Sequence, residues 1–359
     1  MNTLTDSITL HRVKRSRISE VDFANLEFGK HLSDHMFLAE YGDGQWKSSA
    51  VVPYAEFTVM PAMLSLHYGQ SVFEGLKAYR NKDGNISIFR VHKHHQRFLK
   101  SLERMCMPET PEDLFIGGLH ALLETDLAWI PTGDGASLYI RPLMFATESR
   151  LGVKVSDQYK FMIMTSPVGP YMNKPFRIKV EDHFTRAAEG GTGYAKCAGN
   201  YGGAFYPTQM ARQQGYDQVL WTDHKNHEYI DEAGMMNVMF VIGETLVTPR
   251  LSSAILDGVT RDSILTLAHE MGVPTEERRV SVREIEDGIK SGHVKEIFGA
   301  GTAAVVAPIA HINILGKDYT IPEPGKDSFQ NRVKQKLQDI RLGLTPDNHG
   351  WNYIIPVNQ

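Results

Sequence analysis

Residues 190–203 read Gly190-Gly191-Thr192-Gly193-Tyr194-Ala195-Lys196-Cys197-Ala198-Gly199-Asn200-Tyr201-Gly202-Gly203, and Lys196 is the only cation among glycines and other small residues. Glycines allow a backbone to approach a flat ligand closely, and an amine shielded from water is a better nucleophile at neutral pH. The segment therefore indicates a lysine that forms an imine with a flat cofactor. A flexible loop carrying a surface lysine remains open, because glycine clusters are common in loops.

The whole chain has the composition of an ordinary globular protein. Its 359 residues are too many for one compact core and are enough for two domains. Hydrophobic residues make up 42%, and the net charge of −4 provides no basic field for nucleic acid or an anionic membrane. No apolar stretch approaches the ~20 residues that span a bilayer. Cys106 and Cys197 form no CxxC pair, which argues against a disulfide framework and fits a reducing cytoplasm.

The order of predicted elements indicates two domains of mixed α+β structure. Three prolines in the stretch 166–176 cannot join a helix or a central strand, so we place an interdomain linker there. The predicted domains are a small α+β domain over residues 1–165, with 1–20 frayed, and a large domain over 177–359. In the first domain we expect strands at 86–89, 137–146 and 159–165, one helix after the first strand and another over 111–130.

The second half is richer in predicted strands. We expect strands at 177–181, 217–222, 228–230, 236–242, 245–248, 277–280, 295–298 and 303–310, and helices near 200–213, 261–271, 281–291 and 326–341. Ser281 and Glu284 have the spacing of a capping box. We expect the apolar residues 353–355 to dock on the second domain.

Two further features point to a cofactor. Glu232 follows a strand-turn-strand pattern, where a carboxylate can pair with a pyridine nitrogen, although a solvated turn acid is the commoner reading of such a residue. Around Gly258 a glycine turn leads into a predicted helix, so the N–H groups of Val259 and Thr260 can bind a phosphate. A second turn can add the Thr302 hydroxyl. Neither turn has a Walker pattern, so ATP is not implied.

A group of three histidines carries no predicted metal site. His92, His94 and His95 lie at the start of a predicted helix, but they do not present the i, i+4 pair of a helical zinc site. With no CxxC pair elsewhere in the chain, the sequence predicts no metal centre.

Six segments together resemble the branched-chain amino-acid aminotransferases, which are fold type IV pyridoxal phosphate enzymes. The similarity runs from about residue 28 to the C-terminus, with the segments in the family's order and spacing. They are residues 67–79, 138–142, 196–201, 231–234, 256–262 and 298–303. The resemblance implies a smaller α+β N-terminal domain and a larger, strand-rich pseudo-barrel C-terminal domain that binds pyridoxal 5′-phosphate.

The resemblance also implies which residues bind this cofactor. Lys196 would form the Schiff base, Glu232 would pair with the pyridine nitrogen and Tyr201 would bond the 3′-oxygen. Leu256 would pack on the face of the ring. The phosphate would be held by Arg97, Gly258, Val259, Thr260 and Thr302. Without the resemblance, Arg97 reads as a surface arginine on a helix.

On the substrate side, the resemblance implies a carboxylate site and an apolar wall. The backbone N–H groups of Thr302 and Ala303, and Arg141 with Tyr139, would bind carboxylates. Phe28, Tyr68, Phe73 and Tyr171 would form a wall suited to leucine, isoleucine and valine, although aromatic residues more often belong to a plain core. Met235 stands where many relatives have threonine, so one hydroxyl contact is expected to be missing.

The implied activity is a ping-pong transamination in which Lys196 moves the Cα proton. L-Leucine, L-isoleucine or L-valine would give its amino group to 2-oxoglutarate, producing branched 2-oxo acids and L-glutamate. The family is built of homodimers, so a cytoplasmic homodimer is expected, with no nucleic-acid or membrane partner.

Three alternatives remain open. A D-amino-acid aminotransferase and an aminodeoxychorismate lyase share the fold type, but residues 139–141 resemble the L-branched-chain strand rather than the Arg-x-His strand of D-specific relatives. A non-catalytic relative would keep the fold for assembly or regulation. The presence of Lys196 with Glu232 and both phosphate turns speaks against it.

Overall fold

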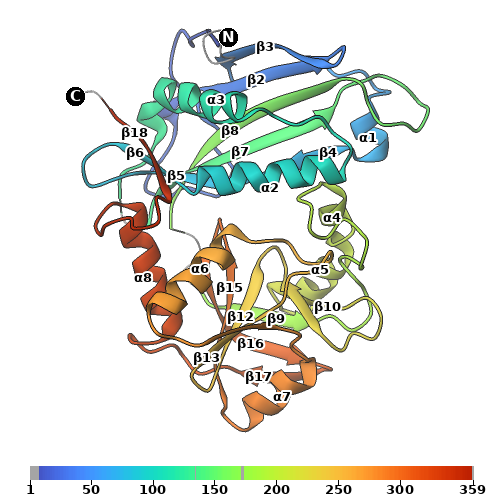
Figure 1. Cartoon of the computed structure of the whole chain (residues 1–359), viewed down its shortest axis with the longest axis vertical. Helices are drawn as coiled ribbons and strands as arrows, with labels where there is room; N and C mark the ends of the chain where they lie inside the picture. The colour runs from blue at the N-terminus through green and yellow to red at the C-terminus, as the bar shows by residue number, and fades with distance from the viewer. Residues whose placement is uncertain (1–7, 134, 171–173, 358–359) are drawn as a thin grey trace. The chain divides into compact units, whose positions relative to one another are not determined.

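The computed structural model describes residues 8–133, 135–170 and 174–357. The chain forms two compact units (Figure 1). Unit 1 comprises Met1–Tyr171, Ala195–Gly199 and Asp339–Gln359, and unit 2 comprises Met172–Tyr194 and Asn200–Gln338. The short segment that carries Lys196 therefore belongs to unit 1, although its neighbours in sequence belong to unit 2.

Unit 1 is built on a nine-stranded sheet. Its strands follow the order β1-β3-β2-β8-β7-β5-β6-β18, and β4 pairs with β7. Their bounds are β1 Thr9–Leu10, β2 His35–Gly42, β3 Gln45–Pro53, β4 Ser71–Phe73, β5 Leu76–Arg80, β6 Ile86–Phe89, β7 Ser137–Ala146, β8 Tyr159–Val168 and β18 Asn352–Ile355. The strands predicted at 86–89 and 137–146 are confirmed.

Strand β8 continues beyond its predicted end into the proline-rich stretch expected as a linker. It pairs with β2 only as far as Ile163, whereas its pairing with β7 continues to Val168. The last residues of β8 thus lie at a local edge of the sheet, where Pro167 is tolerated because its missing N–H is not needed on the open side.

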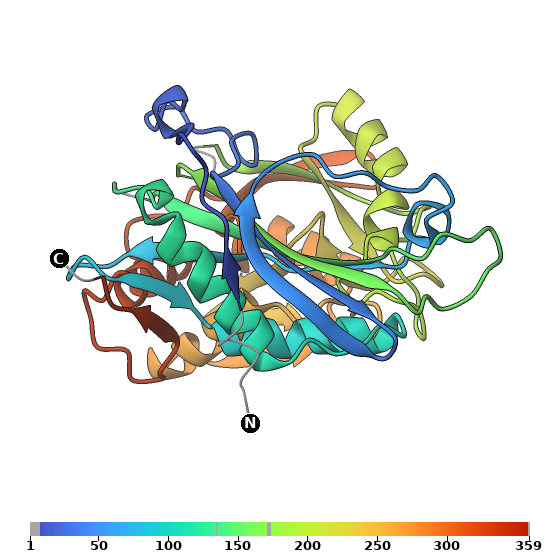
Figure 2. The same cartoon turned by 90° about the horizontal axis from the view of Figure 1, so that it is seen from above.

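Two helices cover one face of this sheet, α2 (Val91–Arg104) and α3 (Glu112–Thr125) (Figures 1 and 2). Phe98 of α2 and Phe115 of α3 are fully buried between helices and strands. Unit 1 also contains α1 (Leu64–Tyr68) and the 3₁₀ turns Ile18–Glu20 and Leu127–Trp129.

The helix predicted over 111–130 ends at Thr125, with Asp126 as its C-cap. The Asp126 carboxylate accepts hydrogen bonds from the backbone N–H of His35 at 2.9 Å and from its Nδ1 at 2.6 Å. This contact with β2 explains why the chain leaves the α-helix here, although the sequence pattern continues.

The C-terminus joins unit 1 rather than the second domain, so the prediction for residues 353–355 was wrong. Strand β18 pairs antiparallel with β6, from Asn352 opposite Phe89 to Ile355 opposite Ile86. Without β18, β6 would be a sheet edge with unpaired N–H and C=O groups. This long-range pairing outweighs the proximity in sequence to the second half of the chain.

Unit 2 contains the second nine-stranded sheet, in the order β11-β10-β9-β16-β15-β12-β13-β14 with β17 paired to β16. Its strands are β9 Phe176–Val180, β10 Gln218–Thr222, β11 Ile230–Ala233, β12 Asn237–Ile242, β13 Thr245–Pro249, β14 Thr275–Arg278, β15 Val294–Gly301, β16 Val305–Ile314 and β17 Lys317–Thr320. A bridge between Ala233 and Met236 links β11 back to the start of β12. The sheet therefore curls back on itself, as expected for a pseudo-barrel.

The helices of the second half occur where the sequence predicted them. They are α4 Gly199–Gly202, α5 Phe205–Gln213, α6 Val259–Glu270, α7 Val282–Lys290 and α8 Phe329–Arg341. The capping box is confirmed on its serine side, since Ser281 Oγ accepts the N–H of Glu284 at 3.0 Å. The helix predicted at 200–213 is divided into α4 and α5.

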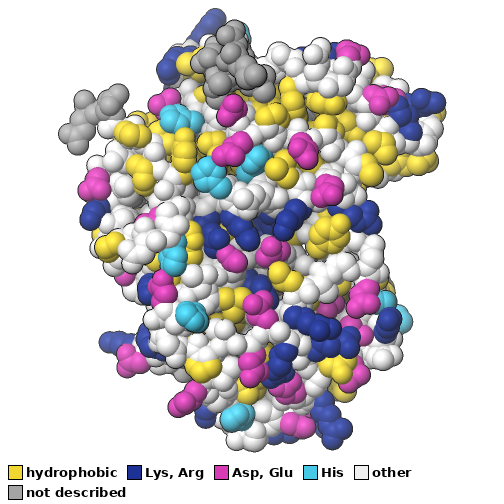
Figure 3. All heavy atoms as spheres, in the orientation of Figure 1, with side chains coloured by type: hydrophobic (Ala, Val, Ile, Leu, Met, Phe, Trp, Pro, Cys, Tyr) yellow, Lys and Arg dark blue, Asp and Glu magenta, His cyan; other side chains and the backbone are white. Residues whose placement is uncertain are grey.

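Charges of both signs share the visible surface of unit 2. Acidic and basic side chains are interspersed over its face in Figure 3. This face has no extended surface of one sign, which is what polyanion binding would need. Among the described residues, no helix is both long and apolar enough to cross a bilayer.

Candidate active site

Lys196 is tied on both sides of its backbone to unit 1. Its N–H donates to Ser101 Oγ at 2.9 Å, and its C=O accepts the N–H of Phe73 at 3.0 Å. The Lys196 Nζ lies 4.8 Å from the centroid of the Phe73 ring. The amine is therefore held against an aromatic face, not displayed on a flexible loop.

Four residues predicted to bind substrate gather in the same unit. The Arg141 guanidinium lies 4.7 Å from the Phe73 ring centroid, and its Nη2 donates to the Tyr139 hydroxyl at 3.0 Å. The rings of Phe28 and Tyr139 meet edge to face with centroids 4.8 Å apart. A Cβ on Gly75 would lie 2.2 Å from the Tyr139 hydroxyl, so only glycine permits this approach.

Arg97 is buried, so its reading as a surface arginine is wrong. Its Nε and Nη2 donate to the two carboxylate oxygens of Glu74 at 2.6 and 2.9 Å. His94 Nδ1 lies 2.9 Å from Glu74 Oε2. Burial raises the pKa of Glu74, but Arg97 and His94 outweigh it and hold that pKa far below its usual range. Burial lowers the pKa of His94, so at neutral pH this histidine is neutral and Nδ1–H donates.

Glu232 is also buried, so the alternative of a solvated turn acid is wrong. It lies within β11, only 4% exposed. Its Oε1 forms an ion pair with Arg186 Nη2 at 2.9 Å, and its Oε2 accepts the N–H of Leu256 at 3.1 Å. Each oxygen has a second lone pair, so the carboxylate can accept a further donor such as a ring N–H. The sequence carried no signal for Arg186, which lies in an irregular segment.

The predicted phosphate turn lies at the N-terminus of α6. Gly258 is the N-cap, and Val259 and Thr260 are the first helical residues. Their N–H groups have no partner within an α-helix and lie at its positive end. Asn237 Nδ2 donates to the Leu256 C=O at 2.9 Å, and a Cβ on Gly258 would lie 1.9 Å from Asn237 Oδ1. The turn is therefore closely packed against the Asn237 side chain.

The second predicted turn contains Thr302 and Ala303, between β15 and β16. It is followed by Val305 with φ of 61°, a left-handed conformation that is strained for a β-branched residue. A Cβ on Gly299 would lie 2.7 Å from the Met236 Cε, so this strand end also packs closely. Strained backbone of this kind is frequent at ligand sites.

Three predicted aromatic residues remain outside these groups. Tyr68, at the end of α1, is 41% exposed and donates its hydroxyl hydrogen to the Leu151 C=O. Tyr201 lies half-buried in α4. Tyr171 lies outside the described residues. Their roles at the site stay predictions.

The structure adds two titratable residues that sequence reasoning missed. Lys77 on β5 is opposite Tyr139 of β7, and burial, aided by Arg341, lowers its pKa to about 7. Burial, aided by Glu232 and Asp223, raises the pKa of Asp231 to about 7. Both residues lie inside segments that carry the family resemblance, but their burial depends on packing that the sequence pattern did not reveal.

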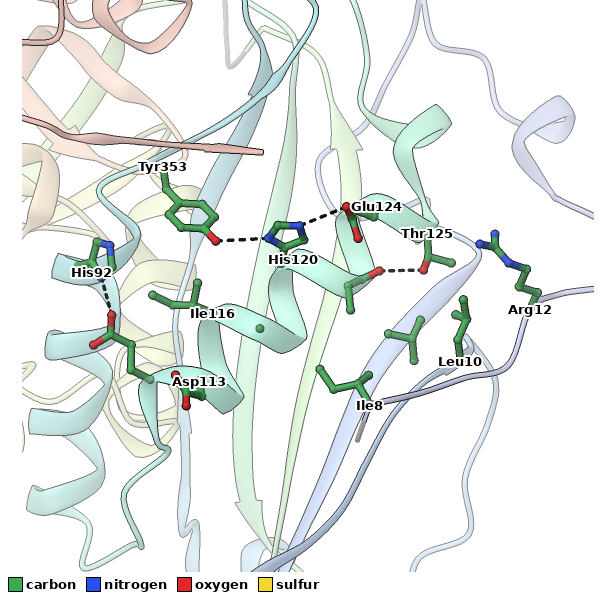
Figure 4. A pocket seen from close by; sticks show the side chains of 14 residues that line it. Ile8, Leu10, Arg12, His92, Asp113, Ile116, His120, Glu124, Thr125 and Tyr353 are labelled. Carbon is green, nitrogen blue, oxygen red and sulfur yellow. Dashed lines mark hydrogen bonds and ion pairs between the residues drawn. The ribbon is translucent and has the colours of Figure 1, made fainter. Parts of the chain in front are cut away.

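A separate pocket of about 600 Å³ lies in unit 1 between β1, α3 and β18 (Figure 4). Ile8 and Ile116 contribute apolar surface, while His120 Nδ1 lies 3.3 Å from the Tyr353 hydroxyl and its Nε2 3.2 Å from Glu124. None of the predicted site residues lines it. The pocket is therefore distinct from the candidate active site.

The sequence matches the class IV amino-transferase family over residues 71–312. A curated relative from Staphylococcus epidermidis, named probable branched-chain-amino-acid aminotransferase, is 43% identical over 355 residues, which cover 96% of this chain and 97% of the relative. A similarity of this extent includes both units and all predicted site residues.

Solved structures share the fold. The branched-chain aminotransferase from Thermoproteus uzoniensis, determined with norvaline, has a TM-score of 0.72 and 25% identity, covering 89% of this chain and 99% of that chain. The branched-chain amino acid aminotransferase from Escherichia coli has a TM-score of 0.71 and 27% identity, covering 89% of this chain and 98% of that chain. The expected fold class is confirmed.

Proposed function

This chain belongs to the class IV aminotransferase family, and we propose that it transfers the amino group of L-leucine, L-isoleucine or L-valine to 2-oxoglutarate, with pyridoxal 5′-phosphate as its cofactor. The products are branched 2-oxo acids and L-glutamate. The near-full-length relative named for branched-chain amino acids supports this substrate class. The observation that carries the proposal is the Lys196 amine held at the ring of Phe73, which the Arg141 guanidinium also contacts.

The described residues fit this cofactor. When bound, it supplies an aldehyde for an amine and a ring that accepts electron density. Glu232, kept in place by Arg186, offers a buried carboxylate to the ring N–H. The first turn of α6 offers backbone N–H groups at the positive end of a helix, which suits a phosphate.

Lys196 acts as the proton carrier of the reaction. With the cofactor bound, the Lys196 amine would take the Cα proton of the amino acid at Nζ and pass it on to the cofactor, a general acid–base contribution of about 10²- to 10⁴-fold. The hydrogen bonds from Lys196 N–H to Ser101 and from Phe73 N–H to the Lys196 C=O hold the backbone still while the side chain moves. The backbone of Lys196 is thus anchored, while its side chain can move.

Substrate recognition has to accommodate an apolar and a carboxylate side chain in turn. Phe28 and Phe73 supply apolar surface, and burial of one aliphatic side chain contributes about 1.5–3 kcal/mol. Arg141, oriented by the Tyr139 hydroxyl, supplies a cation with a fixed plane. We assign the binding of a substrate carboxylate to this pair, together with the turn at Thr302 and Ala303.

Borohydride reduction of the holoenzyme followed by peptide mapping tests the assignment of Lys196. The reduced cofactor adduct is expected on Lys196, and Lys196→Ala should lose both the adduct and turnover. Finding the adduct on another lysine, or on none, contradicts the proposal.

A coupled assay with L-leucine and 2-oxoglutarate tests the substrate class. L-Leucine should be a substrate, while D-leucine and aminodeoxychorismate should not. Activity with either of the last two compounds alone would favour the corresponding alternative. The resemblance also leads us to propose a cytoplasmic homodimer, which light scattering on the purified holoenzyme and cell fractionation would test.

A further inference from the structure

The buried contact between Glu74 and Arg97 has no role in the function proposed so far. Glu74 lies between β4 and β5 and is fully buried, and the Arg97 side chain on α2 is 8% exposed. A buried ion pair contributes little net stability compared with apolar packing of the same volume. Its presence in the core therefore calls for a reason other than stability.

The geometry of this pair fixes the plane of the guanidinium. Arg97 uses Nε and Nη2 toward Glu74, which is a two-point contact between two planar groups. The remaining edge of the guanidinium, which carries Nη1, lies outside this two-point contact. An arginine held along one edge can present its other edge in only one direction.

Glu74 is itself held by further donors. His94 lies one helical turn before Arg97 and donates to Glu74 Oε2, and the N–H of Gly75 donates to the same oxygen at 3.0 Å. These contacts stabilise the carboxylate in one position and in its charged form. Because His94 and Arg97 project from the same face of α2, both can reach one carboxylate.

A single hydroxyl joins Arg97 to the segment that carries the reactive lysine. Ser101 Oγ donates to the Arg97 C=O and accepts the N–H of Lys196, each at 2.9 Å. Phe73, which is adjacent to Glu74, donates its N–H to the Lys196 C=O. The contacts of Glu74 and Ser101 thus set the position of the guanidinium relative to the lysine amine.

We propose that Glu74, supported by His94, is a positioning residue that orients Arg97 toward the phosphate group of the cofactor. This inference rests on the proposed function and on the role at the cofactor phosphate that the family resemblance implies for Arg97. The carboxylate also neutralises Arg97 when no phosphate is bound, which avoids an uncompensated buried cation. Glu74 itself touches neither substrate nor cofactor.

The test compares two ligands that differ only in the phosphate, pyridoxal 5′-phosphate and pyridoxal. Their dissociation constants are measured by equilibrium dialysis, and the fraction of ligand bound is read from visible absorption. In Glu74→Gln the affinity for pyridoxal 5′-phosphate should fall by about 10- to 100-fold, because a guanidinium no longer held along one edge loses its aligned, charge-assisted contact with the phosphate. The affinity for pyridoxal should change by less than about threefold.

Four further variants show how the effect of Glu74 reaches the phosphate. In an Arg97→Met background, Glu74→Gln should cause no further loss of preference for the phosphorylated ligand. His94→Phe should lower that preference and His94→Asn, which keeps an N–H donor, should restore it. His95→Phe is the matched control, because His95 is buried on the same helix but bonds to the Thr110 C=O at 2.8 Å. It should leave the ratio of the two constants unchanged.

Equal losses for both ligands in Glu74→Gln and His94→Phe would overturn the proposal, since they would mean that Glu74 only supports the fold. If Glu74→Gln fails to fold, the two His94 variants decide the question. Failure of the wild-type enzyme to bind the cofactor at Lys196 would instead contradict the proposed function. The two failures are thus distinguishable.

Discussion

Gly258→Ala should disrupt the start of α6 by a steric route that can be traced to one atom. The added Cβ would lie 1.9 Å from Asn237 Oδ1, whereas real Cβ contacts essentially never fall below 3.0 Å. One of the two groups must therefore move by about 1 Å or more. Asn237 is 5% exposed and donates to the Leu256 C=O, so its movement breaks a buried hydrogen bond.

The expected cost follows from these two effects. Overpacking costs about 1–3 kcal/mol, and a buried polar group left without its partner costs about 1–3 kcal/mol. We expect Gly258→Ala to lower the free energy of unfolding of unit 2 by about 2–4 kcal/mol. Because the N–H groups of Val259 and Thr260 begin at this turn, the affinity for pyridoxal 5′-phosphate should fall as well.

Urea unfolding followed by circular dichroism, together with cofactor titration, measures both effects. Asn237→Ala removes the obstructing oxygen, so the second substitution should cost about 1–2 kcal/mol less in that background. Gly202→Ala is the control, because nothing lies within 4 Å of its added Cβ. The steric argument is wrong if Gly258→Ala lowers the free energy of unfolding equally in the wild-type and Asn237→Ala backgrounds, or does not lower it at all.

Three other outcomes are expected from urea unfolding. The folded-state pKa of Lys77 is about 7, against 10.5 in the unfolded chain. The free energy of unfolding should therefore rise as the pH increases from about 7 to 10.5, and Lys77→Met should remove that rise. The folded-state pKa of Asp231 is about 7 against 3.8 in the unfolded chain, so stability should fall as pH increases over that interval, and Asp231→Asn should abolish the fall. Glu232→Gln should cost unit 2 about 3 kcal/mol, because it leaves Arg186 as a buried cation without its counterion, and adding Arg186→Met should recover part of the loss without restoring cofactor affinity.

Local sequence patterns predicted those elements whose limits depend on local chemistry. The alternation in residues 86–89 and 137–146 matched β6 and β7, and the Ser281 cap marked the start of α7. The patterns failed where a distant residue decides the limit. Asp126 ends α3 because it bonds to His35, and residues 353–355 join the first sheet because β6 needs a partner.

The chemical groups available for the reaction can be read from the order of residues alone. An isolated lysine among glycines, a glycine before a helix and a carboxylate on a hairpin are recognisable without a fold, because each is a property of a few adjacent residues. The order and spacing of six such segments were enough to indicate the family.

Which of these groups meet, and which are buried, depends on how the strands and helices pack. Arg186 pairs with Glu232, and Arg97 with Glu74, although each pair is distant in sequence and no periodicity links its members. The physical reason is that a buried charge needs a counterion in the same region of the core, and the packing of strands and helices determines which residue is near enough to serve.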